Sequence, residues 1–221
     1  MRVKIYQINP DRDIDRMKFI SLNDGQTPDP SIYDEVFDAE IDERDPEEIF
    51  ARFNTEGHPL FRGHALSVSD VIVTDGEASI CQSIGFRKIP FDTGKAQKPD
   101  NLMRVVYVEP NRKPYAAEIL HTLEAEQKAV GGYIEPIYND DETCLIGNEE
   151  AKLMGMAGNR RIGDGSSIIA GPFFICGITE DAFRSLTDTE VTKYMDRFKE
   201  PEQISQAEVE ADTGYTIIFG M

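Results

Sequence analysis

The chain has 221 residues, with 41 Asp and Glu against 23 Lys and Arg, so its formal net charge is -18. A surface this acidic repels nucleic acid and anionic membranes, which disfavours direct binding to either and favours basic proteins or cations as partners. Hydrophobic residues make up 40% of the chain, enough to build packed cores and to argue against wholesale disorder.

The segment before residue 92 predicts a mixture of strands and helices. Its clearest signal is Asp45-Pro46-Glu47-Glu48, where a capping Asp, a Pro at the first helical position and first-turn acids indicate a helix start. Asp75-Gly76 indicates a hairpin turn. The expected elements are a strand at 3–8, a short helix at 11–22 that turns Ile14, Met17, Phe19 and Ile20 inward, a strand at 32–41 with its acids facing water, a helix from 46 to about 54 that buries Ile49, Phe50 and Phe53, and strands at 65–74 and 79–91.

Residues 92–102 are polar, contain Gly and Pro and lack periodicity, so we expect a linker there. Beyond it, Pro114 opens the clearest helical pattern, which carries an apolar stripe and ends at Gly131-Gly132. The expected elements are strands at 103–110, 133–138, 143–147, 166–178 and 214–221, and helices at 114–132, 148–161, 179–186 and 188–199.

These patterns predict an α+β fold with two small domains, each a mostly antiparallel sheet with one or two packed helices. The expected domains are 1–91 and 103–221, the second with a C-terminal helical extension, joined by the linker 92–102. The three cysteines are far apart in the sequence, so they indicate neither a disulfide framework nor a zinc site. No signal segment and no apolar run of about 18 residues is visible, so we expect a cytoplasmic protein.

Residues 34–48 hold nine carboxylates and one arginine. Asp45, Glu47 and Glu48 are explained by the helix start, and Val36, Phe37 and Ile41 tie the segment to a core. The remaining acids are the candidate interaction surface of the chain. They are Asp34, Glu35, Asp38, Glu40, Asp42 and Glu43.

Groups that carry chemistry are few. His58 and His64 in GHPLFRGH are separated by five intervening residues, a spacing that disfavours a metal site and favours loop histidines. His121 is expected to be solvated on a helix. The loop 159–167 (Asn159 to Ser167), with Lys152, Arg160 and Arg161 nearby, offers an anion-binding alternative to a plain turn, and the plain turn is favoured. Nucleophile elbows, Walker loops and dinucleotide fingerprints are missing, so no catalytic residue and no cofactor is expected.

The sequence words themselves resemble known families. VFDAEID, EEIFARFN, FRGHALSVSDVIVTDG and SIGFRKI, spread over residues 36–89, resemble the YodL-like domain. VVYVEPNRKPY, VGGYIEPIY, IGNEEAKLMGMAGNRR and IIAGPFFICG, spread over residues 105–177, resemble a domain of unknown function found in phages and conjugative elements. The resemblance implies the context of mobile genetic elements, with cargo near genes for DNA transfer or for countering host defence, and it brings no catalytic residue.

Three functions follow as expectations. The first is a non-enzymatic accessory protein of a mobile element, an anti-restriction or other anti-defence factor that binds a basic or nucleic-acid-binding host protein by presenting carboxylates as phosphates are presented on DNA. The second is an adaptor in conjugation or replication that binds one basic partner. The third is a small enzyme or ligand- or nucleotide-binding protein that uses His58, His64 or the loop 159–167.

Overall fold

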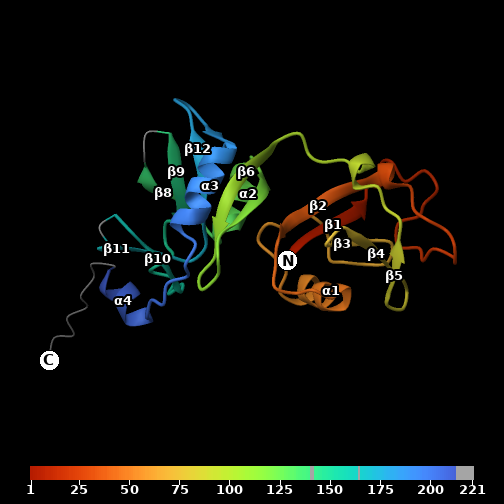
Figure 1. Cartoon of the computed structure of the whole chain (residues 1–221), viewed down its shortest axis with the longest axis horizontal. Helices are drawn as coiled ribbons and strands as arrows, with labels where there is room; N and C mark the ends of the chain where they lie inside the picture. Colours follow the sequence, from red (N-terminus) through yellow and green to blue (C-terminus); the bar gives the residue numbers. More distant parts are fainter. Residues whose placement is uncertain (140–141, 164, 213–221) are drawn as a thin grey trace. The chain divides into compact units, whose positions relative to one another are not determined.

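The computed structural model describes residues 1–139, 142–163 and 165–212. The chain divides into two compact units, Met1–Asn101 and Leu102–Met221, each with its own sheet (Figure 1). The architecture is α+β with mostly antiparallel strands, as the sequence predicts.

The N-terminal unit is a five-stranded antiparallel sheet in the order β2-β1-β3-β4-β5. Strands β3 and β4 form the hairpin expected around Asp75-Gly76, and both turn residues have positive φ. The elements are β1 (Arg2–Ile8), a 3-10 turn η1 (Pro30–Ile32), β2 (Tyr33–Glu40), α1 (Pro46–Thr55), β3 (Val71–Thr74), β4 (Glu77–Cys81), β5 (Phe86–Ile89) and a 3-10 turn η2 (Thr93–Lys95).

Helix α1 covers one face of this sheet. The Asp45 side chain accepts a hydrogen bond from the Glu47 backbone N–H, which confirms the predicted cap. The helix buries Ile49 and Phe53, and the Phe53 ring lies 4.9 Å from that of Phe37 in β2. The opposite face has a second apolar cluster, in which Tyr6, Ile8, Leu22, Tyr33, Val71, Val73, Ala78, Ile80 and Ile89 are buried.

The short helix expected at 11–22 is wrong, because this segment consists of turns. The Asp13 carboxylate accepts hydrogen bonds from the backbone N–H groups of Met17 and Lys18, which competes with helical pairing. Ile14 is 90% exposed, and Phe19 and Ile20 are also exposed. Of the four residues expected to point inward, Met17 does pack against the core. The run 79–91 splits into β4 and β5 at Gly85, and 65–70 precede β3 without being part of it.

The C-terminal unit has a six-stranded sheet, in which β7-β6-β12-β9-β8 follow one another and β13 pairs with β12, and a separate ribbon of β10 and β11. The elements are β6 (Leu102–Val108), β7 (Tyr115–Leu120), α2 (Leu123–Val130), β8 (Ile134–Asn139), β9 (Thr143–Asn148), β10 (Gly158–Ile162), β11 (Ser167–Ala170), β12 (Phe173–Ile178), β13 (Phe183–Arg184), α3 (Asp188–Arg197) and α4 (Gln206–Ala211).

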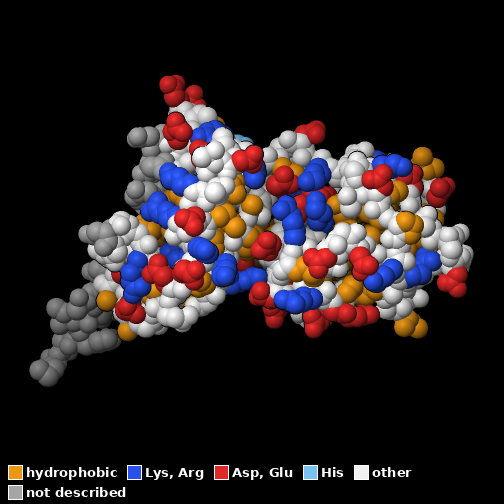
Figure 2. Space-filling model, in the orientation of Figure 1, with side chains coloured by type: hydrophobic (Ala, Val, Ile, Leu, Met, Phe, Trp, Pro, Cys, Tyr) orange, Lys and Arg blue, Asp and Glu red, His pale blue; other side chains and the backbone are white. Residues whose placement is uncertain are grey.

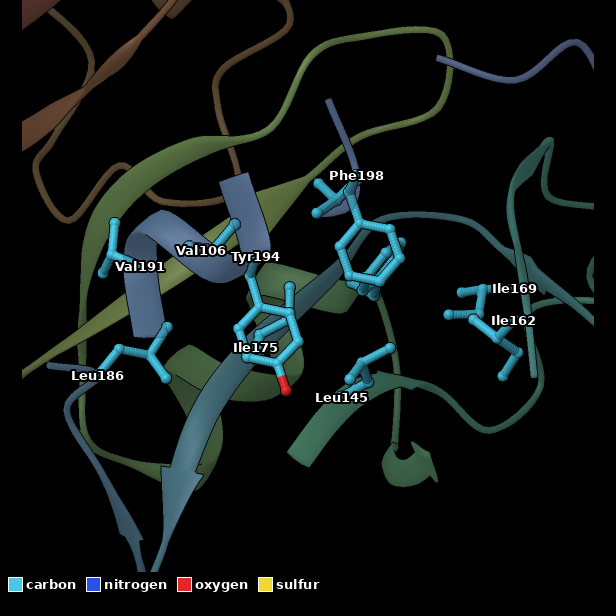
Figure 3. Close-up of a cluster of buried hydrophobic side chains, with 11 residues drawn as sticks. Val106, Leu145, Ile162, Ile169, Ile175, Leu186, Val191, Tyr194 and Phe198 are labelled. Carbon is cyan, nitrogen blue, oxygen red and sulfur yellow. The ribbon is translucent and has the colours of Figure 1, made fainter. Parts of the chain in front are cut away.

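Helices α2 and α3 pack on opposite faces of the larger sheet. Alternate residues of one strand point to opposite faces, so Ile175 of β12 faces α3 while its neighbour Cys176 faces α2. On the α3 side, Val191 and Tyr194 pack onto the strands in the cluster drawn in Figure 3. On the α2 side, the Tyr107 hydroxyl donates a 2.6 Å hydrogen bond to the carbonyl of Ala129.

Several predicted helices of this half are wrong. Residues 114–132 form strand β7 followed by the shorter helix α2, which does end at Gly131 with its φ of 75°. Residues 148–161 form turns and β10, residues 179–186 contain β13, and 166–178 split at Gly171 into β11 and β12. Helix α3 confirms the pattern at 188–199, α4 was not expected, and the predicted strand at 214–221 lies outside the described residues.

Candidate functional site

The acidic segment 34–48 does not present the face that its sequence predicts. Glu35 and Asp38 are only 1% and 3% exposed, so the expectation that they point outward is wrong. The register explains why, because β1 and β2 pair Lys4 with Asp38 and Tyr6 with Glu35, and a bulge lies between these two pairs. Residues three apart in a regular strand face opposite sides, and the bulge brings both acids to the same side of the sheet.

The two buried carboxylates are held by basic and hydroxyl groups of the same unit. Lys4 Nζ lies 3.2 Å from Glu35 Oε2 and 3.0 Å from Asp38 Oδ2. Arg2 donates two hydrogen bonds to Asp38, and the Tyr6 hydroxyl donates one to Glu35. Burial would raise the pKa of Asp38, but the hydrogen bonds from Arg2 and Lys4 outweigh it and hold that pKa below its ordinary value. Glu35 and Asp38 are therefore paired with cations of their own unit.

The acids that remain at the surface form a smaller patch. Asp34 and Glu43 pair with Arg12 and Arg52. Glu40 and Asp42 are exposed, as are three acids at the start of α1. We call the exposed set the β2–α1 patch: Glu40, Asp42, Asp45, Glu47 and Glu48. In Figure 2, acidic side chains line the lower edge of the N-terminal unit, where Figure 1 places α1.

The candidate anion site in the C-terminal unit has its cations engaged. Arg160 is 1% exposed and donates to the backbone carbonyls of Phe198, Arg112 and Asn159. Arg161 pairs with Glu202 and Glu208, and Lys152 pairs with Asp212 at 2.6 Å. Of the loop 159–167, Asn159, Arg160 and Arg161 belong to strand β10. Each of the three cations therefore has its own partners within the unit, and the three do not share a contact that would define one anion site.

The histidines of GHPLFRGH lie in different surroundings. His58 is buried against the ring of Phe37, and its Nδ1 accepts a hydrogen bond from the Leu60 backbone N–H. His64 belongs to another network, described next. They therefore do not converge on one site.

A polar network around Asp70 is the feature that sequence reasoning missed. The Gln7 amide donates 2.8 Å hydrogen bonds to Asp70 Oδ2 and to the carbonyl of His64, and accepts one from the His64 N–H. Ser67 N–H also donates to Asp70 Oδ2. Within the described part of the chain, the buried atoms Asp70 Oδ1 and His64 Nε2 have no hydrogen-bond partner.

The sequence feature that could have indicated this network is the motif GHALSVSD at residues 63–70. A Cβ atom at Gly63 would lie 2.2 Å from Gln7 Oε1, so the backbone needs a glycine there to approach the amide. Ser69 has a positive φ of 75°, and its N–H and the Asp70 carbonyl pair with the backbone of Cys81. Within the described residues, the hydrogen-bond partners of the His64 ring are the Gln7 amide and the carbonyl of Ala65.

The comparisons with known proteins bear on both units. Each half of the chain matches its own family model. Residues 2–91 match the YodL-like domain, and residues 103–199 match a domain of unknown function (DUF3846). No curated protein and no solved structure gives a match. The resemblance seen in the sequence words is therefore confirmed for both halves, and the second match extends beyond residue 177 into α3.

In these terms, both β1–β2 and the Asp70 network lie inside the YodL-like match, while Lys152, Arg160 and Arg161 lie inside the DUF3846 match. None of the helices in the described ranges combines the length and the apolar character needed to cross a membrane.

Burial makes Asp70 a source of pH-dependent stability. Desolvation raises its pKa to about 6, against the opposing hydrogen bonds from Ser67 and Gln7 and the charges of His64 and Lys18. Because the folded state binds this proton more tightly than the unfolded chain, stability falls as pH rises from about 4 to about 6.

We expect the YodL-like domain to lose about 2 kcal/mol of stability through Asp70 between pH 4 and pH 7, and Asp70→Asn to remove most of that loss. Urea unfolding of wild type and variant across this range measures it, with Asp75→Asn, an exposed turn residue, as the control. Parallel pH profiles for the wild type and Asp70→Asn would contradict the assignment.

Proposed function

We propose that this chain is a non-enzymatic, cytoplasmic accessory protein of a mobile genetic element that binds a basic, nucleic-acid-binding host protein. The observation that carries the proposal is the excess of 18 negative charges in the chain. Such an excess steers a basic partner toward the surface and raises the association rate.

The pairing of basic side chains supports this proposal. Cations of both units, such as Arg2, Arg52 and Arg184, already contact carboxylates of their own unit. These internal ion pairs neutralise part of the positive charge, and the chain still carries a net excess of 18 negative charges that a basic partner can meet. The β2–α1 patch is the part of the segment 34–48 that stays at the surface.

An anti-restriction role is the specific form that we favour. A protein that occupies the DNA channel of a nuclease needs carboxylates spaced along a path, since duplex DNA carries one charge per about 1.7 Å of its axis. Burial removes Glu35 and Asp38 from such a path. The proposal therefore relies on the β2–α1 patch together with the overall charge.

Charge removal from the patch is the first test. We expect Glu40→Gln, Asp42→Asn and Glu48→Gln together to weaken binding of a Lys/Arg-rich peptide about tenfold at low salt, because they remove three exposed charges of the segment 34–48. Asp45 is kept because it caps α1. Isothermal titration at two salt concentrations measures the change.

The matched control is the triple variant Glu149→Gln, Glu150→Gln and Glu180→Gln, which removes the same charge from exposed positions of the other unit. Equal losses in the two triple variants would contradict the patch as the interface. Failure of the wild type to bind the peptide at low salt would contradict the proposed function.

Partner identity separates the two forms of the proposal. A DNA mimic should be captured with several nucleases from a host lysate, and added duplex DNA should displace it from them. An adaptor of conjugation or replication should retain one partner whatever DNA is added.

A further inference from the structure

The C-terminal unit has an open pocket of about 530 Å³ beside the start of α2. Its wall is formed by α2, by β8, β9 and β12, and by the turn that leads to β13. In Figure 1, α2 lies against the sheet that supplies these strands. We call it the Glu126 pocket, after the acid that lines it.

Glu126 is a buried carboxylate with little to hold it. The residue is only 5% exposed, although it lies in the first turn of an exposed helix segment. Its ion-pair partner among the described residues is His121, whose Nε2 lies 3.9 Å from Glu126 Oε1. Among the described residues no group hydrogen-bonds to the carboxylate, and burial raises the pKa of Glu126 while His121 opposes the shift. A buried acid in this state gains from a cationic partner.

The rest of the pocket is suited to the stem of a long cationic side chain. Leu123, Ile178 and Phe183 line the same pocket as Glu126 and provide apolar surface there. Asp181 adds a second acid at the exposed side of the pocket. Of the described residues that line the pocket, His121 is the one basic group, so the lining favours a cation.

We propose that the Glu126 pocket is a socket for an arginine side chain of the protein partner. Arginine fits better than lysine because its guanidinium binds a carboxylate through two parallel hydrogen bonds and loses less hydration on burial. Its methylene groups would lie along Leu123 and Ile178. The inference rests on the proposed function, since it names the side chain by which a basic partner is recognised.

The pocket can be tested with N-acetyl-arginine methylamide as the probe on the full chain at pH 7.5. We expect wild type to bind it with a dissociation constant of about 1 mM, as befits a single side chain, and to shift the backbone NMR signals of Leu123 and Ile178. The corresponding lysine derivative should bind more weakly. Absence of shifts at these residues would overturn the inference without requiring any variant.

Two variants and a control complete the test. Glu126→Gln keeps the shape of the side chain and should lower the affinity for the probe at least about tenfold. Glu124 is an exposed acid two residues earlier on α2, and Glu124→Gln should leave the affinity unchanged. His121→Gln removes the competing imidazole and should retain binding. Loss of binding in His121→Gln equal to that in Glu126→Gln would overturn the inference, because the pair would then be structural.

The outcomes separate this inference from the proposed function. If the Lys/Arg-rich peptide binds and the arginine probe does not, the socket is wrong and the proposed function stands. If the probe binds and the peptide does not, the socket exists and its place in recognition of a basic protein is wrong.

Discussion

Replacing Arg160 with methionine is expected to destabilise the C-terminal unit by about 3–5 kcal/mol, because it leaves buried carbonyl groups without donors. The guanidinium donates to the carbonyl of Phe198 at the end of α3 and to that of Arg112 in the turn between β6 and β7. It also contacts the Asn159 carbonyl and amide oxygens. One side chain thus ties β10 to two distant segments.

Arg161→Met is the matched control, since it removes the same charge one residue further along β10. Its pairs with Glu202 and Glu208 are partly exposed, and we expect a loss below about 1 kcal/mol. Urea unfolding followed by hydrogen exchange of peptides from β10 and α3 measures both. A loss in Arg160→Met no larger than that in Arg161→Met would show that the carbonyls find water or other donors.

Arg160 also shows what the sequence can and cannot predict. Sequence reasoning groups it with Lys152 and Arg161 as a possible anion site because the three cations flank a glycine-rich loop. Apart from the neighbouring Asn159, the partners named here lie 38 or more residues away along the chain: Phe198, Asp212, Glu202 and Glu208. A charge pattern read locally cannot show that each cation is already paired.

Local signals predicted the elements that local chemistry determines. The cap at Asp45, the left-handed Gly131 and the turn at Asp75-Gly76 each depend on neighbouring residues, and all three are present. The helix predicted at 114–132 was wrong in its first part because Ala117 and Ile119 fit the alternating pattern of a strand as well as the apolar stripe of a helix. Pairing of β7 with β6 selects the strand, and pairing is not visible in a local window.

The predicted orientation of the acidic side chains of β2 was wrong for a related reason. Alternation assigns faces only in a regular strand, and the bulge between its pairs with β1 changes the assignment after Val36. Charged residues were expected to face water, which is the common case. Lys4 and Arg2 make burial of Glu35 and Asp38 possible, and they lie more than 30 residues earlier in the chain.

Lys4→Met should destabilise the N-terminal unit by about 3 kcal/mol at pH 7, because both buried carboxylates lose the cation that they share. The loss should depend on pH. Asp38 has a folded-state pKa below its ordinary value, so its stabilising contribution is present above about pH 4 and is lost as pH falls through the folded pKa. In Lys4→Met the Asp38 carboxylate contributes less stability, so less is lost when it is protonated. The difference in free energy of unfolding between wild type and Lys4→Met should therefore become smaller below about pH 4.

Lys88→Met provides the control for this prediction, since the ion pair of Lys88 with Glu77 joins two largely exposed side chains and its removal should change stability little. Urea unfolding at pH 7 and pH 3.5, with hydrogen exchange read separately for peptides of β1 and β2, gives both the size and the location of the effect. A gap that is constant with pH would mean that Lys4 acts through packing of its methylene groups. A small loss at pH 7 would mean that Arg2, Tyr6 and Lys98 are sufficient to stabilise the two buried carboxylates without Lys4.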